Sequence, residues 1–313
     1  MREELNLQST FANLIDRADA IQALCKDEIF EMSELHMTDD LTIKGMELSQ
    51  LAQGELCGKL RIPGKYFSRL VAEKRNAVAA ENINTWLTDD KRKIMLREYD
   101  GHIRGVLSGS YAKFDAPDIL RSVKDVFGDA HFNLKGSFIN EERLHVRLVE
   151  SEMLPIEGED LYAGITIDSS DIGRSGLYAS FLIYKQVCTN GLKIAKSHAE
   201  IFRQKHIGIT SEEFKAGLED GFKLFNNLKD EVTVMIEETR KVPLPKDIED
   251  LQKKLKERTL LADDDIEEIF DLMTSKYQVN QWGLINGITE VAQKFTLDRR
   301  IALEEAAGEL LVG

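Results

Sequence analysis

The sequence predicts an α+β fold: a central antiparallel sheet built from hairpins, with N-terminal helices before it and a helical C-terminal region after it. Residues 94–187 alternate apolar and polar residues and carry turn signals such as Asp100-Gly101. Residues 5–30 and the chain after Thr210 instead repeat apolar residues at helical spacing. Strand-rich and helix-rich stretches that follow one another in this way are typical of α+β proteins.

The sequence predicts an N-terminal helical segment over residues 1–35, followed by an α+β core over residues 36–197. The elements expected here are one amphipathic helix over 5–30, a short strand over 41–46, two helices within 47–75 that meet near Ile62-Pro63, a hairpin around Asp100-Gly101, a helix over 115–127, and hairpins over 132–150 and 161–187. Proline is well placed at the start of the second of the paired helices, because its missing N–H would be unsatisfied there anyway.

The last part of the chain predicts a helical C-terminal region (198–313). A long helix begins with Thr210 and Glu213 in capping-box spacing and ends before Pro243. Further helices are expected over 246–258, 264–275, 281–295 and 298–311. The apolar stripe of the long helix is expected to be core rather than an interface; it consists of Phe214, Leu218, Phe222, Phe225 and Leu228.

The composition is that of an ordinary globular protein. Among 313 residues 42% are hydrophobic and 31% charged, and no apolar run approaches the length of a membrane span. The N-terminal stretch is acidic and helix-like, unlike a secretory signal. Cys25, Cys57 and Cys188 lie far apart, which argues against a disulfide framework or a zinc cluster. We therefore expect a cytoplasmic protein without contact with a membrane.

The net charge of −14 would disfavour nucleic acid as a partner, but the charge is unevenly spread. Residues 1–58 hold 4 basic and 12 acidic residues, and residues 148–313 hold 20 basic and 31 acidic residues. Residues 59–147 hold 17 basic and 12 acidic residues, an excess of five positive charges. Because local charge decides the steering of an anionic partner, this middle segment is where a nucleic-acid surface is expected.

The hairpin around Asp100-Gly101 supplies the candidate surface. With a two-residue turn, Arg97 would face Arg104, and the two would repel unless an anion lay between them. One face of the hairpin would then carry Lys93, Met95, Arg97, Tyr99, His102, Arg104 and Val106. The strand "RLHVRLV" repeats the pattern, with Arg143, His145 and Arg147 on one side.

Arginines beside aromatic rings are the groups that grip phosphates and stack bases in single-stranded nucleic acid. The nucleic-acid-binding residues predicted on this basis are Lys93, Arg97, Tyr99, His102, Arg104, Arg143 and Arg147. The alternative is a solvated outer sheet face, which antiparallel sheets often have. Both interpretations stay open on the sequence alone.

Other motifs favour structure over chemistry. The paired helices of 47–75 suggest a helix-turn-helix but fit an ordinary helical corner better. The loop 168–176 could bind a small anion through Ser169, Ser170 and Arg174, although a plain surface hairpin loop is the favoured interpretation. Asp263-Asp264-Asp265 marks a helix start, where carboxylates meet the positive end of the helix dipole.

Cys188, in "YKQVCTNGLKI", is expected at the end of a buried strand rather than in a catalytic site. A nucleophilic cysteine needs a base within reach, and a metal needs recognised ligand spacing. Neither His198 nor His206 supplies these. The sequence contains no P-loop, dinucleotide fingerprint or H-E-x-x-H motif, so we expect a non-enzymatic protein with no cofactor and no metal.

Several stretches together resemble one family. These are "LAQGELCGKLRIPGKYFSRL", "NINTWL", "REYDGHIRGVLSGSYAKFDAPDIL", "YKQVCTNGL" and "NQWGLINGITEVAQKF", the last followed by "ALEEAAGELL". In this order they resemble the phage- and plasmid-like proteins grouped as domain of unknown function 932, over roughly residues 40–311. The family has no settled activity, so no catalytic residue carries over. The resemblance implies a mobile-element context, in which DNA handling and interference with host defence are both expected roles.

These observations lead to one main hypothesis and one alternative. The main hypothesis is a mobile-element DNA-binding protein that binds or anneals single strands in recombination and self-associates as a homo-oligomer. The alternative is an anti-defence protein that binds and inhibits a host defence or restriction protein, with its acidic flanks acting as a nucleic-acid mimic. A host replication protein is a further expected partner. A measurement of salt-sensitive DNA binding distinguishes the main hypothesis from the alternative, because only the main hypothesis predicts such binding.

Overall fold

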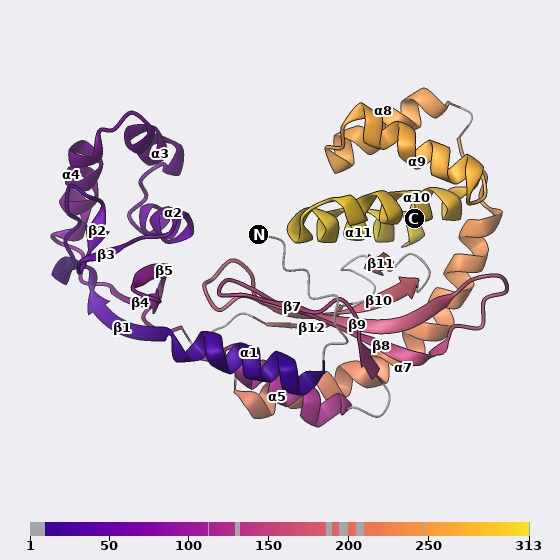
Figure 1. Ribbon diagram of the computed structural model, residues 1–313, viewed down its shortest axis with the longest axis horizontal. Helices are drawn as coiled ribbons and strands as arrows, with labels where there is room; N and C mark the ends of the chain where they lie inside the picture. Colours follow the sequence, from indigo (N-terminus) through magenta and orange to yellow (C-terminus); the bar gives the residue numbers. More distant parts are fainter. Residues whose placement is uncertain are drawn as a thin grey trace.

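The computed structural model describes residues 10–111, 113–128, 132–185, 190–193, 200–204, 210–245 and 247–312. Within these residues helices surround antiparallel sheets, which confirms the predicted α+β class. The molecule is arched (Figure 1): an N-terminal lobe and the C-terminal helices rise as two arms on the same side of a larger sheet. We call this larger sheet the main sheet.

The N-terminal lobe comprises residues 25–108. Its elements are β1 (Cys25–Glu31), the 3₁₀ turn η1 (Met32–Glu34), β2 (Thr42–Ile43), β3 (Met46–Glu47), α2 (Gln50–Lys59), α3 (Gly64–Ala72), α4 (Asn76–Leu87), β4 (Lys93–Tyr99) and β5 (His102–Ser108). The strands β1, β4 and β5 form an antiparallel sheet in that order, and α2–α4 pack on one face of it around a separate hydrophobic core. The two helices predicted within 47–75 are confirmed, and Pro63 is the N-cap of α3.

The N-terminal helix is shorter than predicted. α1 (Phe11–Ala23) begins with Thr10, whose hydroxyl accepts a hydrogen bond from the Asn13 N–H. The chain then becomes β1, which pairs with β4 over its full length. The expected continuation of the helix to Phe30 is therefore wrong. Pairing with a neighbouring strand outweighs the helical spacing of the apolar residues, as tertiary context often does.

The main sheet contains β6 (Phe132–Leu134), β7 (Phe138–Ile139), β8 (Leu144–Met153), β9 (Leu161–Ser169), β10 (Leu177–Lys185), β11 (Asn190–Lys193) and β12 (Glu200–Gln204). The order is β11-β10-β9-β8-β6, with β12 also paired to β10 and β7 to β8. The predicted hairpins over 132–150 and 161–187 are confirmed within the described residues. β12 lies within the range predicted to be helical, so the helical region begins later than expected, at α7.

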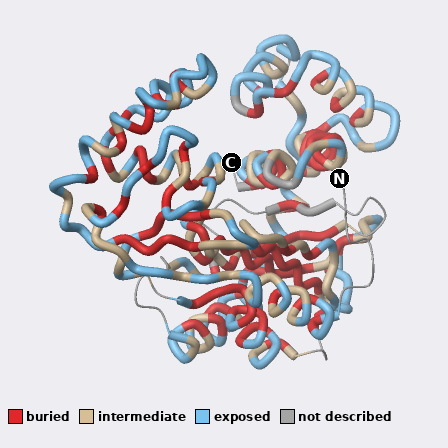
Figure 2. The backbone as a smooth tube through the Cα atoms, turned by 60° about the vertical axis from the view of Figure 1, so that its left-hand side comes forward, coloured by how far each residue is buried: buried red, intermediate tan, exposed pale blue. Residues whose placement is uncertain are grey.

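One face of the main sheet is covered by α1, α5 (Ala116–Phe127) and α7 (Ser211–Lys241) (Figure 1). The capping box of Thr210 and Glu213 that starts α7 is present as predicted. Phenylalanines interlock across this layer, and Phe181 of β10 packs 5.1 Å, centroid to centroid, from Phe225 of α7. The predicted apolar stripe of α7 is therefore part of the hydrophobic core. Figure 2 shows that buried residues gather at the strands in the middle of the molecule.

The C-terminal arm consists of α8 (Ile248–Thr259), α9 (Asp263–Ser275), α10 (Gln281–Val291), the 3₁₀ turn η2 (Ala292–Lys294) and α11 (Leu297–Val312). The motif "NQWGLINGIT" docks α10 onto the sheet edge. The Asn280 side chain caps the helix at Gly283, and the Trp282 indole N–H donates to Glu159 at 2.7 Å. No helix among the described residues has the length and apolar character needed to cross a membrane.

The opposite face of the main sheet, which looks into the arch, is polar. Because side chains alternate along strands, Tyr178 and Ser180 of β10 lie on this face, together with His145 and Arg147 of β8. α11 covers the end of this face that carries Arg147. The remaining part faces the N-terminal lobe across the hollow of the arch.

Candidate nucleic-acid interface

The predicted hairpin of β4 and β5 forms, but its register shifts within the strands. Tyr99 pairs with His102 as expected. A β-bulge then places Arg97 opposite Gly105, and Arg104 becomes the extra residue of β5. The prediction that the two arginines face each other is therefore wrong, and so is the repulsion inferred from it.

Arg97 is completely buried at the junction of the N-terminal lobe with the main sheet. Its Nε and Nη2 donate to both carboxylate oxygens of Asp27 at 2.8 and 2.9 Å. Its Nη1 donates to Asp115 at the start of α5, at 2.7 Å, and to the Asp171 carbonyl oxygen at 2.8 Å. Two carboxylates and a carbonyl therefore satisfy the guanidinium inside the protein.

The other residues of this hairpin are mostly covered as well. Arg104 is buried, donates to the Glu141 carbonyl oxygen and lies 5.9 Å from the ring centroid of Tyr99. Its Nε and Nη2 have no hydrogen-bond partner among the described atoms. Tyr99 and His102 are half-buried and meet edge to face. Lys93 is exposed.

The arginines of β8 lie in a second buried network. Arg147 donates to Glu304 of α11 at 2.6 Å and to His145 at 3.0 Å. His145 in turn contacts Asp168 at 2.7 Å, and half-buried Arg143 donates to the same carboxylate at 3.1 Å. Because Arg147 Nε donates to His145 Nε2, the imidazole carries its proton on Nδ1, facing Asp168.

The exposed basic face predicted from the sequence is thus not found. Burial of Arg97, Arg104 and Arg147 in the interior contradicts the solvent-facing position that the hypothesis assumed. A phosphate could reach these guanidiniums only after the networks around them opened. That these residues touch nucleic acid stays a prediction, and any accessible interface must be sought elsewhere.

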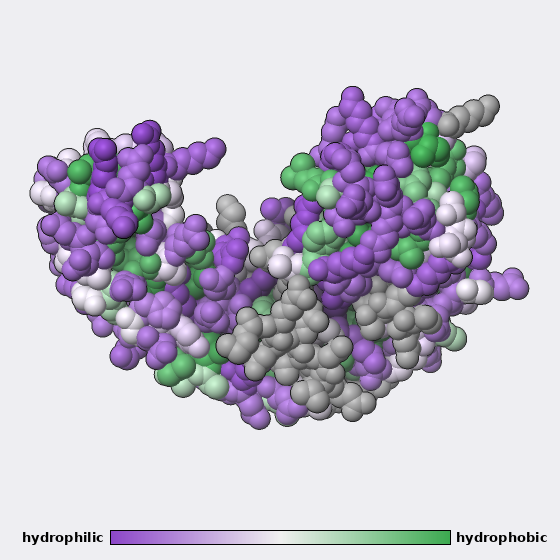
Figure 3. Space-filling model, turned by 45° about the horizontal axis from the view of Figure 1, so that its top comes forward, coloured by the Kyte–Doolittle hydropathy of each residue, from purple (hydrophilic) through white to green (hydrophobic). Residues whose placement is uncertain are grey.

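A cleft of about 850 Å³ opens between the N-terminal lobe and the polar face of the main sheet. Its wall is formed by α2 and the end of β5, and its floor by β10, β12 and the loop between β9 and β10. Figure 3 shows the molecule hollowed between its two arms, with hydrophilic residues over much of both rims. This volume is typical of ligand-binding pockets.

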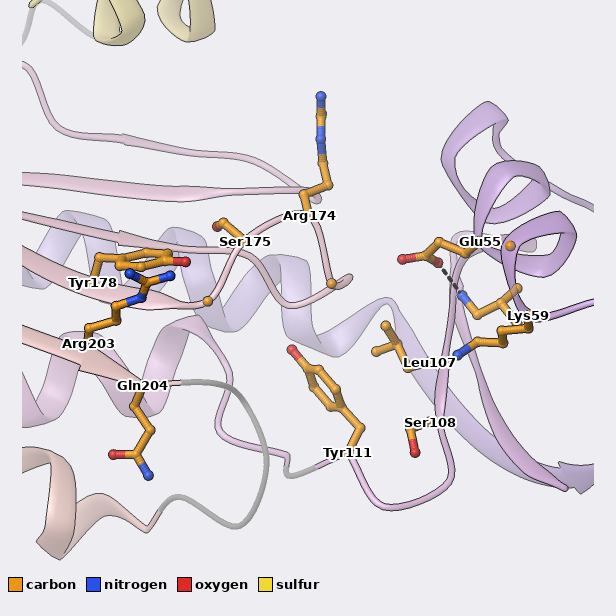
Figure 4. Close-up of a pocket in the computed structure, with 14 residues that line it drawn as sticks. Glu55, Lys59, Leu107, Ser108, Tyr111, Arg174, Ser175, Tyr178, Arg203 and Gln204 are labelled. Atoms are coloured by element: carbon orange, nitrogen blue, oxygen red, sulfur yellow. Dashed lines mark hydrogen bonds between the residues drawn. The ribbon is translucent and has the colours of Figure 1, made fainter. Parts of the chain in front are cut away.

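Among the described residues, three cationic side chains line the cleft. Arg203 of β12 and Arg174 of the β9–β10 loop are exposed, and Lys59 of α2 is half-buried on the opposite wall. Arg174 also forms an ion pair with Glu142 at the rim. In Figure 4 Arg174 extends from its loop into the open space, and Lys59 approaches from α2. Burial lowers the pKa of Lys59 from its ordinary value.

Two tyrosines stand among these cations. Tyr178 is paired directly with Arg203 across β10 and β12, and the guanidinium lies 5.3 Å from the ring centroid (Figure 4). Tyr111 donates its hydroxyl hydrogen to the Ser170 carbonyl oxygen at 3.2 Å. Burial raises the pKa of Tyr111, so the phenol stays protonated. A ring stacked on a guanidinium is a platform for a planar ligand.

Glu55 is the acidic residue among the described side chains that line the cleft. Its carboxylate accepts a hydrogen bond from the Val106 N–H at 2.6 Å. Burial raises its pKa to about 7, although that hydrogen bond and the charge of Lys59 act in the opposite direction. The described lining of the cleft therefore carries more basic than acidic side chains, and its one acidic side chain, Glu55, lies in the wall.

A family model for a domain of unknown function (DUF932) matches residues 104–308, about two thirds of the chain. The chain belongs to this family. The matched part of the DUF932 protein contributes Arg174, Tyr178 and Arg203 to the cleft, whereas Lys59 and Glu55 lie before it. No curated protein and no solved structure matches the chain.

The anion-binding interpretation of the loop 168–176 of the DUF932 protein agrees with the structure for only one of its three residues. Ser169 and Ser170 are buried, so they do not face an external anion. Arg174 does line the cleft. Sequence reasoning missed Lys59 and Arg203, because the first lies on a short helix and the second in a stretch read as helical.

Other sites weighed on the sequence receive no support as chemistry. Cys188, His198 and His206 lie outside the described residues. Cys25 and Cys57 are free thiols, and burial raises the pKa of each. In the part of the DUF932 chain that the structure describes, no three metal-ligating side chains gather.

Proposed function

We propose that this DUF932 protein binds DNA in the cleft, with single strands favoured, and that it acts by binding rather than by catalysis. The proposal places it in the host-cell cytoplasm as a phage or plasmid protein that anneals strands in recombination, in line with the sequence resemblance. We further propose that the chain self-associates and that a host replication or defence protein is a second partner. Arg97, Arg104 and Arg147 are buried and do not line the cleft, so phosphate contact in the cleft does not need them.

The observation that carries the proposal is the stacked pair of Tyr178 and Arg203 beside Arg174 on the floor of the cleft. Unpaired bases stack on aromatic rings, and neighbouring cations neutralise the backbone phosphates. Lys59 on the opposite wall allows a strand to be held from both sides. In duplex DNA the flat faces of the bases are covered by their neighbours, which is why single strands are favoured.

Reversing the two floor arginines tests the site. With three phosphates neutralised and a salt slope of about −0.7 per phosphate, a fourfold rise in salt should weaken binding of single strands roughly 20-fold. In Arg174→Glu/Arg203→Glu Lys59 is the cation left among the described lining residues, so the same rise in salt should weaken binding about threefold, and the affinity itself should fall strongly. Fluorescence anisotropy with a labelled oligonucleotide at 50 and 200 mM salt measures both quantities.

Arg121→Glu/Lys223→Glu is the matched control, because it changes the net charge equally. Arg121 and Lys223 are exposed on α5 and α7, which cover the other face of the main sheet. Equal weakening by both double variants would show a general charge effect and contradict the assignment of the cleft. If neither strand type binds the unmodified protein at micromolar concentration, the DNA proposal is wrong, and affinity capture of a host defence protein tests the alternative.

Replacing Tyr178 by alanine tests the preference for single strands. Loss of one stacking platform removes about 1–3 kcal/mol per base, so single-strand affinity should fall about 5- to 150-fold. Tyr178→Phe keeps the ring and should bind within about twofold of the unmodified protein, since its contribution is the aromatic face. Anisotropy titrations of single-stranded and duplex oligonucleotides with all three proteins provide the comparison. An equal loss on both strand types would contradict base stacking at Tyr178.

A further inference from the structure

Glu55 is held in a fixed position in the cleft wall. Its Oε2 accepts the Val106 N–H of β5 at 2.6 Å. Its Oε1 lies so close to the β9–β10 loop that a Cβ atom added at Gly173 would come within 2.9 Å of it. The carboxyl group is therefore held between α2, β5 and this loop, at the wall of the cleft.

The ionisable groups around Glu55 do not neutralise it directly. Lys59 lies one turn further along α2 and forms no ion pair with it in the described structure, while its carbonyl oxygen accepts a hydrogen bond from Arg92. Arg174 projects from the loop, and the other ionisable side chains on the described cleft lining are Tyr111, Tyr178 and Arg203. α3 and β3, which pack against α2 and β5, place no ionisable side chain on that lining.

We propose that Glu55 contacts the bound nucleic acid and couples its binding to the uptake of one proton. This inference rests on the proposed function. A phosphate chain entering the cleft approaches a carboxylate that forms no ion pair among the described residues, which costs electrostatic free energy in a partly desolvated site. Protonation of Glu55 removes that cost and turns the group into a hydrogen-bond donor for a phosphate or base oxygen.

The direction of the linkage follows from the charges. Glu55 has a pKa of about 7 in the free protein, and nearby phosphates disfavour its charged form, so the pKa rises further in the complex. The complex therefore holds more protons than the free protein near pH 7, and affinity increases as pH falls. If the pKa rises by one unit on binding, affinity should be about fivefold higher at pH 6 than at pH 8.

Glu55→Gln isolates this group, because the amide keeps an acceptor oxygen for Val106 and carries no charge. Anisotropy titrations with a single-stranded oligonucleotide at pH 6, 7 and 8 and constant ionic strength are the test. We expect the variant to bind at pH 8 as tightly as the unmodified protein does at pH 6, and to lose most of the pH dependence. Glu81→Gln, at an exposed position of α4, is the matched control and should behave like the unmodified protein.

Calorimetry gives a readout that does not depend on comparing affinities. Binding enthalpies measured at pH 7 in two buffers of different ionisation enthalpy report the protons taken up. The unmodified protein should take up a fraction of a proton that Glu55→Gln does not. An unchanged pH profile and equal proton uptake in the variant overturn the role of Glu55 while leaving DNA binding intact. Absence of DNA binding at every pH overturns the proposed function itself.

Discussion

Replacing Arg97 by methionine is expected to lower the free energy of unfolding by about 3–5 kcal/mol, because it leaves two carboxylates buried without their cation. The guanidinium is fully buried and donates to Asp27 and Asp115 at 2.7–2.9 Å. Methionine is of similar length but cannot compensate either negative charge. Urea denaturation at neutral pH, followed by circular dichroism, measures the loss.

The matched control is Arg69→Met, in which the same substitution removes an exposed ion pair. Arg69 on α3 contacts Glu73 one turn later, and its side chain is 76% exposed. Such a pair contributes only about 0.3–0.5 kcal/mol. A similar small loss for Arg97→Met would contradict the view that this junction depends on a buried charge network.

The same network predicts a change in the pH dependence of stability. Burial acts to raise the pKa of Asp27, but the hydrogen bonds and charge of Arg97 outweigh it and hold that pKa below its ordinary value. A carboxyl group with a lowered folded-state pKa stabilises the fold above its unfolded pKa of about 3.9, and this contribution is lost as pH falls through the folded value. Without Arg97 that contribution disappears. Arg97→Met should therefore lose less stability than the unmodified protein between pH 5 and pH 3.

The burial of Arg97 also shows where prediction from the sequence succeeds and where it ends. The turn at Asp100-Gly101 was predictable because it depends on two adjacent residues that tolerate positive φ, and both adopt it. The bulge at Arg104 was not predictable, because it depends on Arg97 finding Asp27 and Asp115 in the fold. A strand in which arginine alternates with apolar residues has the same sequence pattern whether the arginine faces solvent or is buried in ion pairs.

The candidate cleft lay beyond sequence reasoning for a similar reason. Its cations come from α2, the β9–β10 loop and β12, which are far apart in the chain and meet only through the packing of the N-terminal lobe against the main sheet. The helices α5 and α7–α11 were predictable because each repeats its own apolar spacing and has local start signals. β1 was missed because its role as a strand depends on pairing with β4, some 70 residues away.

Replacing Glu304 by glutamine is the second change with a large expected effect, and it tests how the C-terminal arm is attached. Glu304 of α11 is fully buried and accepts hydrogen bonds from Arg147 at 2.6 Å and Arg300 at 3.0 Å. Burial alone would raise the pKa of Glu304, but the two guanidiniums outweigh it and lower that pKa. The glutamine variant keeps the shape and removes the charge. Arg147 is then left as an uncompensated buried cation, so about 3–5 kcal/mol should be lost.

Glu305→Gln is the control for this variant, because the neighbouring side chain of α11 is half-buried and undergoes the same chemical change. We expect a loss below about 0.5 kcal/mol for it, as for most substitutions away from buried networks. Hydrogen exchange distinguishes local from global effects: opening of α11 and the polar face of β8 should become faster in Glu304→Gln before the α5–α7 layer is affected. If exchange in α11 and β8 stayed unchanged, Arg147 would not be what anchors the C-terminal arm, and the apolar contacts of α11 alone would account for its docking.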